Sequence, residues 1–117
     1  MTPAIRNIAL FSSSDFEETY TFRRKSDKAL LDFTSCTGVA EIRINPTDAA
    51  PVGSFTVTFP SPGVASVSMP RATILTMLGT NKEILAHWDL NIVSLAGKSI
   101  MYLRGACGIF TANSRVA

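Results

Sequence analysis

Few residues of this 117-residue chain are of the types that carry out catalysis or bind metal ions. His87 is the single histidine, and the two cysteines, Cys36 and Cys107, are far apart in the sequence. A nucleophilic pair would need one thiol beside the imidazole, and sequence separation alone leaves that pairing open. Zinc sites need several His, Cys or carboxylate ligands, and no Cys-x-x-Cys or His-x-x-x-His spacing occurs. We therefore predict no catalytic, metal-binding or cofactor-binding residues.

Serines, glycines and carboxylates do not change this prediction. No Gly-x-Ser-x-Gly motif is present, and the glycines occur singly rather than in a phosphate-binding loop. Glu17 and Glu18 are adjacent in a predicted strand, so their side chains point to opposite faces and cannot act together as acid and base. Asp32 and Asp89 can meet other carboxylates only through the fold. We expect that the protein is not an enzyme.

The charge balance argues against nucleic-acid and membrane-surface partners. Lys and Arg number 11 against 9 Asp and Glu, and a net charge of +2 is too small an excess for either partner. The basic residues gather at 23–28 beside an acidic segment at 15–18, which predicts solvated charge at a hairpin tip. Charged residues make up only 17% of the chain. This low value fits either a surface covered by a partner or a compact monomer rich in Ser and Thr.

The sequence also indicates the cellular compartment in which the chain is made. No segment approaches the roughly 20 apolar residues that span a bilayer. The N-terminal segment 1–6 lacks the basic and apolar regions of a signal peptide. We therefore expect the chain to start in a cytoplasm, with Cys36 and Cys107 as reduced, buried thiols rather than a disulfide.

Alternating apolar and polar residues predict a series of short strands. The pattern is clear at 86–92, where Trp88 lies on the apolar side and His87 on the polar side. At 39–44, the same alternation directs Ile44 inward. A turn is predicted at 95–98, and Gly105 and Gly108 mark a bulge or a close approach of two backbones. The predicted strands are 5–10, 16–22, 39–44, 54–59, 64–68, 86–92, 100–105 and 107–111.

One short helix interrupts the strands at about residues 69–78. Ile74, Met77 and Leu78 keep the spacing of a single helical face. Ser68 is a candidate cap, Pro70 suits the first turn, and Gly79 can end the helix. The helix and about eight strands predict one all-β domain over 1–117, an antiparallel sandwich or small barrel, with 1–4 and 113–117 as flexible or docking tails. The large core residues are predicted to be Phe16, Phe22, Phe55, Phe59, Trp88 and Phe110.

Taken in order, three parts of the sequence resemble a known family. They are 15–22 (DFEETYTF), 31–43 (LDFTSCTGVAEIR), and 88–93 (WDLNIV) together with 102–105 (YLRG). These segments resemble the small immunoglobulin-like domains of tailed-phage virions and are similar to the N-terminal domain of phage baseplate upper proteins. Two departures are Phe33 with 35–36 in place of a simpler bend, and Trp88 where a tyrosine is commoner. The resemblance implies an immunoglobulin-like sandwich that has no catalytic residues and attaches to a phage particle.

The expected function is therefore that of a structural virion protein, assembled in the host cytoplasm. We expect an accessory subunit that docks on the tail, baseplate or head–tail region, with fibre anchoring as an open role. Its expected partners are other virion proteins and further copies of itself, with no nucleic acid and no membrane. Residues 2–10 and the C-terminal tail are the predicted docking segments, and removal of residues 1–10 is expected to leave a folded core.

Besides a small cytoplasmic enzyme, which would need an active pocket that no spacing reveals, two alternatives remain open from the sequence. One is a capsid decoration protein, which shares the same particle and the same absence of chemistry. The other is a carbohydrate- or receptor-binding module, which presents exposed aromatic residues beside Asp or Asn. Tyr20, Tyr102 and Trp88 are the available aromatic residues, although the alternation places Trp88 inward.

Overall fold

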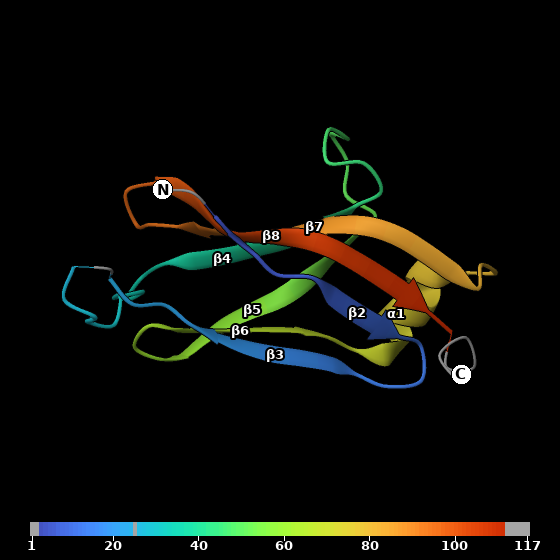
Figure 1. The fold of residues 1–117 in the computed structure, drawn as a ribbon, viewed down its shortest axis with the longest axis horizontal. Helices are drawn as coiled ribbons and strands as arrows, with labels where there is room; N and C mark the ends of the chain where they lie inside the picture. Colours follow the sequence, from blue (N-terminus) through green and yellow to red (C-terminus); the bar gives the residue numbers. More distant parts are fainter. Residues whose placement is uncertain (1–2, 25, 112–117) are drawn as a thin grey trace.

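The computed structural model describes residues 3–24 and 26–111. The predicted C-terminal tail at 113–117 and the first two residues lie outside this part of the chain. Most of the described chain is in strands, with one short helix, and the predicted all-β class is confirmed (Figure 1). The elements are β1 Ala4–Ile5, β2 Ile8–Phe11, β3 Phe16–Thr21, β4 Thr37–Arg43, β5 Gly53–Ser61, β6 Val64–Met69, α1 Arg71–Leu78, β7 Glu83–Val93 and β8 Ser99–Phe110.

The strands form one curled sheet in the order β1–β8–β7–β4–β5–β6–β3, and β2 also pairs with β8. The sheet curls at β5, because Phe55 pairs with β4 while Thr56 and later residues pair with β6. Two walls therefore face each other across the core. The prediction that all strands are antiparallel is wrong for the N-terminal segment, because β1 and β2 run parallel to β8 while the other neighbours are antiparallel, and the sheet is mixed.

Three details differ from the sequence-based expectation. The strands predicted at 100–105 and 107–111 are one continuous strand, β8, because Gly105 and Gly108 both stay in register with β7. Ile44 is 39% exposed rather than inward, since β4 ends at Arg43. The helix begins at Arg71 with no side-chain cap from its preceding residue, and the Arg71 N–H instead donates to the Asp15 carboxylate at 2.7 Å. Gly79 ends the helix with φ 61°, as predicted.

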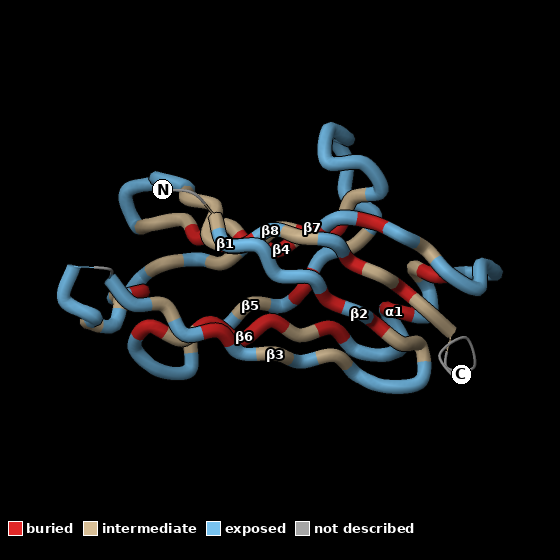
Figure 2. Tube along the Cα trace, viewed as in Figure 1, coloured by how far each residue is buried: buried red, intermediate tan, exposed pale blue. Residues whose placement is uncertain are grey.

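The core lies between the two walls and is closed at one end by α1 (Figure 2). Of the predicted aromatic core, Trp88 and Phe55 are buried, and Phe16, Phe22 and Phe59 are partly buried against the core cluster. Phe110 instead stacks on Phe11 with ring centres 5.7 Å apart. The predicted bend supplies one further core residue, Phe33, which is only 6% exposed and contacts the rings of Phe22, Phe59 and Tyr102.

A close approach of two backbones fixes the N-terminal segment to the sheet. Between β1 and β2, the Arg6 carbonyl oxygen accepts a hydrogen bond from Trp88 Nε1–H at 2.7 Å. A Cβ atom at Gly105 would overlap that carbonyl group, so the predicted close approach is confirmed. Ile8 and Leu10 are buried in the core. We therefore expect removal of residues 1–10 to disrupt the core, contrary to the expectation from the sequence.

We predict that Gly105→Ala lowers the free energy of unfolding by about 1–3 kcal/mol, because the new methyl group forces Arg6 away from β8. Urea unfolding followed by the fluorescence of Trp88 measures the change. Ser99→Ala, an exposed substitution at the start of the same strand, is the control and should leave the midpoint unchanged. A Gly105→Ala variant as stable as the wild type would contradict the close approach of Arg6 to β8.

Candidate functional site

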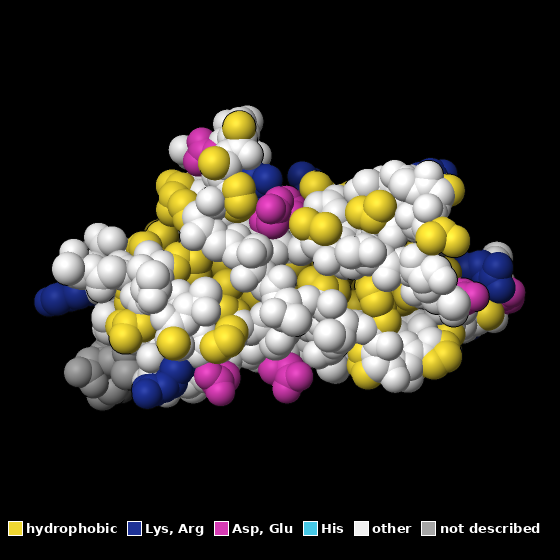
Figure 3. All heavy atoms as spheres, turned by 180° about the vertical axis from the view of Figure 1, so that it is seen from behind, with side chains coloured by type: hydrophobic (Ala, Val, Ile, Leu, Met, Phe, Trp, Pro, Cys, Tyr) yellow, Lys and Arg dark blue, Asp and Glu magenta, His cyan; other side chains and the backbone are white. Residues whose placement is uncertain are grey.

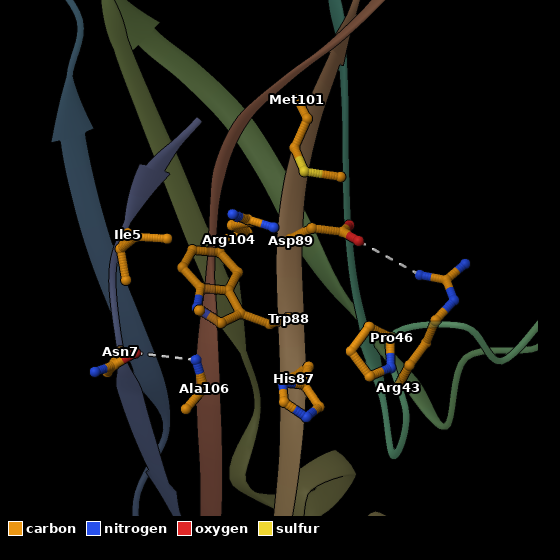
Figure 4. A pocket seen from close by; sticks show the side chains of 11 residues that line it. Ile5, Asn7, Arg43, Pro46, His87, Trp88, Asp89, Met101, Arg104 and Ala106 are labelled. Atoms are coloured by element: carbon orange, nitrogen blue, oxygen red, sulfur yellow. Dashed lines mark hydrogen bonds and ion pairs between the residues drawn. The ribbon is translucent and has the colours of Figure 1, made fainter. Parts of the chain in front are cut away.

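A hollow of about 390 Å³ lies on the outer face of the sheet, over β8, β7 and the end of β4 (Figure 4). Its centre is formed by His87 and Asp89, which project from β7, and Arg43 extends toward Asp89 from β4. Ile5 and Met101 supply apolar walls. The hollow is a shallow depression in a strand surface, since the indole of Trp88 beneath it is buried.

Arg43 is the centre of an ionic network in this hollow. Its guanidinium lies 2.9 Å from the Glu41 carboxylate and 3.6 Å from the Asp89 carboxylate, and its Nε–H donates to the Asp48 carbonyl oxygen at 2.9 Å. Asn91 also donates to Asp89, at 3.1 Å. Burial raises the pKa of Asp89, and the positive charge of Arg43 opposes that rise. The guanidinium thus joins carboxylates of two neighbouring strands, and the arrangement is suited to holding β4 against β7.

The residues considered for nucleophilic chemistry are not brought together. Cys107 faces the core and His87 faces solvent, so they lie on opposite faces of the sheet. Burial raises the pKa of the Cys107 thiol to about 12, which keeps it protonated at neutral pH. Cys36 immediately precedes β4, whereas His87 pairs with Arg43 at its other end, about 20 Å away along the strand. Both cysteines are free thiols.

The carboxylates singled out in the sequence serve local structure. Asp32 accepts hydrogen bonds from the Thr34 hydroxyl and N–H at 2.6 and 2.9 Å, which lower the pKa of Asp32. Glu17 and Glu18 point to opposite faces, as predicted, and Glu18 accepts the Tyr20 hydroxyl at 2.8 Å. Within residues 3–24 and 26–111, no group of three or more His, Cys, Asp or Glu residues is placed to hold a metal ion.

The three aromatic residues considered for sugar binding do not form an exposed platform. Trp88 is 2% exposed and Tyr20 is 7% exposed, and their rings lie 6.1 Å apart. Burial, with the Glu18 hydrogen bond, raises the pKa of Tyr20. Tyr102 is half-buried between Phe22 and Phe33. The inward direction predicted for Trp88 is confirmed.

The feature that sequence reasoning missed is the free edge of β3, the last strand of the sheet. The Phe22 N–H donates to the Gly63 carbonyl oxygen at 2.7 Å, which continues the pairing of β3 with β6. Backbone groups alternate between the two sides of a strand, so those of Glu17, Thr19 and Thr21 point away from β6. All three residues are exposed. In the described part of the chain, no other strand pairs with β3.

This free edge continues one residue beyond the strand. Arg23 forms an isolated bridge with Leu30, in which Arg24 N–H bonds to Ala29 and Leu31 N–H bonds to Phe22. In a bridge of this pattern the backbone groups of Arg23 point away from Leu30. We define the β3 edge as the outward backbone of Glu17, Thr19, Thr21 and Arg23. The alternation of apolar and polar residues cannot predict which strand lies at the end of a sheet, because contacts between residues far apart in the sequence set the strand order.

The β3 edge borders open space. A groove of about 320 Å³ separates it from β1, and the guanidinium of Arg6 lies over the Tyr20 ring in that groove, 5.4 Å from its centre. A smaller hollow of about 200 Å³ lies beside the start of β3 and is lined by Phe11, Asp15 and Phe16. The two ends of the curled sheet therefore approach each other without pairing.

Comparison of the chain with models of protein families and with curated proteins finds no match. Among the described residues, no helix is long and apolar enough to cross a membrane.

We predict that Arg43→Met lowers the free energy of unfolding by about 1–2 kcal/mol at neutral pH, because Glu41 and Asp89 face each other across β4 and β7. The folded-state pKa of Asp89 is already raised, and loss of the cation raises it further. Protonation then removes the repulsion, so the difference from wild type should shrink as the pH falls toward about 4.

Urea unfolding of the two proteins at several pH values measures this difference. Lys98→Met removes a positive charge from the exposed turn between β7 and β8 and is the control. A stability difference that is independent of pH would contradict the role given to Arg43.

Proposed function

We propose that this chain is a structural, non-catalytic subunit of a tailed bacteriophage particle. In this role it docks on the tail, baseplate or head–tail region and works by association with other virion proteins and with copies of itself. Its location is the virion, after assembly in the host cytoplasm. Fibre anchoring is one use of such a subunit.

The observation that carries the proposal is the β3 edge. A strand whose residues are exposed and whose N–H and C=O groups point away from its neighbour is a template onto which another strand can add. By contrast, the ionic network around Arg43 is internally paired, since Arg43, Glu41, Asp89 and Asn91 contact one another. The molecule therefore offers a partner a strand edge, while its buried and half-buried polar groups are used internally.

The ordered resemblance to immunoglobulin-like virion domains adds the biological setting. The resembling segments correspond to β3, the bend before β4 with β4 itself, β7 and part of β8. Three of these strands are adjacent, in the order β8–β7–β4, and β3 is the free end of the sheet. The assignment to a phage particle rests on this resemblance, while docking through the β3 edge rests on the geometry of the sheet.

A capsid decoration protein would use the same edge on another part of the particle. A carbohydrate-binding module needs an exposed aromatic platform, and Trp88 and Tyr20 are buried. We therefore favour particle assembly over sugar binding.

Immunogold electron microscopy of lysate particles, with antibody raised against the purified protein, tests the proposal. We expect gold at one place on the particle, and that place identifies tail, neck or capsid. Antibody preabsorbed with the purified protein is the control and should leave particles unlabelled. Unlabelled particles, with all of the protein in the soluble fraction, would overturn the virion assignment.

A further inference from the structure

The β3 edge has a charge pattern that matches a second copy of itself. Its outward residues begin with the acidic Glu17, continue through Thr19 and Thr21, and end with the basic Arg23. Figure 3 shows acidic groups along the lower rim of the molecule, where Figure 1 places β3, with a basic group beside them at one end, and basic groups next to acidic ones at the other end, where the following loop turns. Two such edges in antiparallel orientation set the acidic end of one against the basic end of the other.

From this pattern we propose that two copies of the chain pair through their β3 edges, as an antiparallel, two-fold symmetric dimer. The inference names a partner within the proposed assembly role and rests on that role for its biological setting. The curled sheets of the two copies then join into one continuous sheet through β3.

The backbone restricts the possible registers. Residues directly opposite each other in an antiparallel pair direct their backbone groups either both toward the partner strand or both away. The outward residues of one β3 edge must therefore oppose outward residues of the other. A two-fold axis at Tyr20 satisfies this rule, and it sets Glu17 opposite Arg23 and Thr19 opposite Thr21 of the second copy.

This register uses two charges that have hydrogen bonds but no ion pair: the Glu17 carboxylate accepts the Ser66 hydroxyl at 3.4 Å, and the Arg23 guanidinium donates to the Lys28 carbonyl oxygen at 3.1 Å. Within residues 3–24 and 26–111, neither Glu17 nor Arg23 belongs to an ion pair. An axis at Thr19 would instead oppose Asp15 and Arg23, but the Asp15 carboxylate already accepts the Arg71 N–H at the start of α1. The register centred on Tyr20 therefore leaves the contact at the start of α1 intact and gains two charge pairs, for which the Glu17 carboxylate and the Arg23 guanidinium each keep further hydrogen-bonding atoms.

Side-chain chemistry on both faces agrees with this register. Opposed threonines and opposite charges are favourable cross-strand pairs in antiparallel sheets. On the inner face, Arg6 and Glu18 both contact Tyr20. An arginine and a carboxylate from each copy then lie beside the two-fold axis, where each can approach the opposite charge of the other copy. The other free end of the sheet is less suited, because β2 has 4 residues against the 6 of β3.

Sedimentation equilibrium of the purified chain over a range of concentrations tests the dimer. We expect a reversible monomer–dimer equilibrium for the wild type. Glu17→Arg and Arg23→Glu should each raise the dimer dissociation constant about tenfold, or about 1.4 kcal/mol spread over the two symmetric pairs. The combined Glu17→Arg/Arg23→Glu variant restores opposite charges and should dimerise like the wild type.

Two further variants provide a charge control and a test of the backbone hydrogen bonds. Glu83→Arg makes the same charge change at the start of β7 and should leave the dissociation constant unchanged. Thr19→Pro removes an outward N–H that β6 does not use, and it should abolish dimerisation in a protein that retains its Trp88 fluorescence.

Two outcomes would overturn the inference. One is a wild-type chain that stays monomeric at every concentration. That result would mean that the charged residues of the β3 edge prevent strand pairing. The other is a dimer that is indifferent to Glu17→Arg and Thr19→Pro. Sedimentation uses the purified protein and particle labelling uses the virion, so this inference and the virion assignment can fail independently.

Discussion

The hydrogen bond from Trp88 to the Arg6 carbonyl group is the constraint on which the arrangement of the sheet depends. It joins residues 82 positions apart, and it requires Arg6 to lie directly over Gly105 of β8. Asn7 adds a second link, since its Oδ1 accepts the Ala106 N–H at 3.0 Å. With both links in place, β1 and β2 continue the sheet beyond β8 in parallel. The N-terminal segment therefore completes the fold of its own chain, and β3 is left at the opposite end of the sheet.

Contacts in the core hold the two walls together, and contacts on the outer surface hold neighbouring strands of one wall together. Inside, Trp88 contacts the rings of Tyr20 and Phe55, which come from the opposite wall and from the strand at which the sheet curls. Outside, Arg43 holds two carboxylates on neighbouring strands. The ionic groups of this network already contact one another. The outward backbone of β3 pairs with no other strand in the described part of the chain, and this is why we place docking there.

The sequence patterns correctly predicted those features that depend on the spacing of neighbouring residues. Alternation identified the strands and the inward direction of Trp88, and the glycine at 105 was correctly associated with a close approach. The sequence patterns did not predict features that contacts between residues far apart in the sequence determine. Phe33 lies in an irregular segment, yet the rings of Phe22, Phe59 and Tyr102 bury it. The parallel pairing of β2 with β8 and the position of β3 at the end of the sheet have no local signature, so the candidate docking edge was visible only in the fold.

Residue-resolved hydrogen exchange of the β3 amides tests the central claim most directly. At low protein concentration, the outward amides of Glu17, Thr19, Thr21 and Arg23 should exchange quickly, while the amides that face β6 stay protected. At high concentration, the outward amides should become protected, which would produce protection along the whole of β3. Fast exchange of these four amides at every concentration would contradict the account, because it would mean that the β3 edge pairs with no second copy.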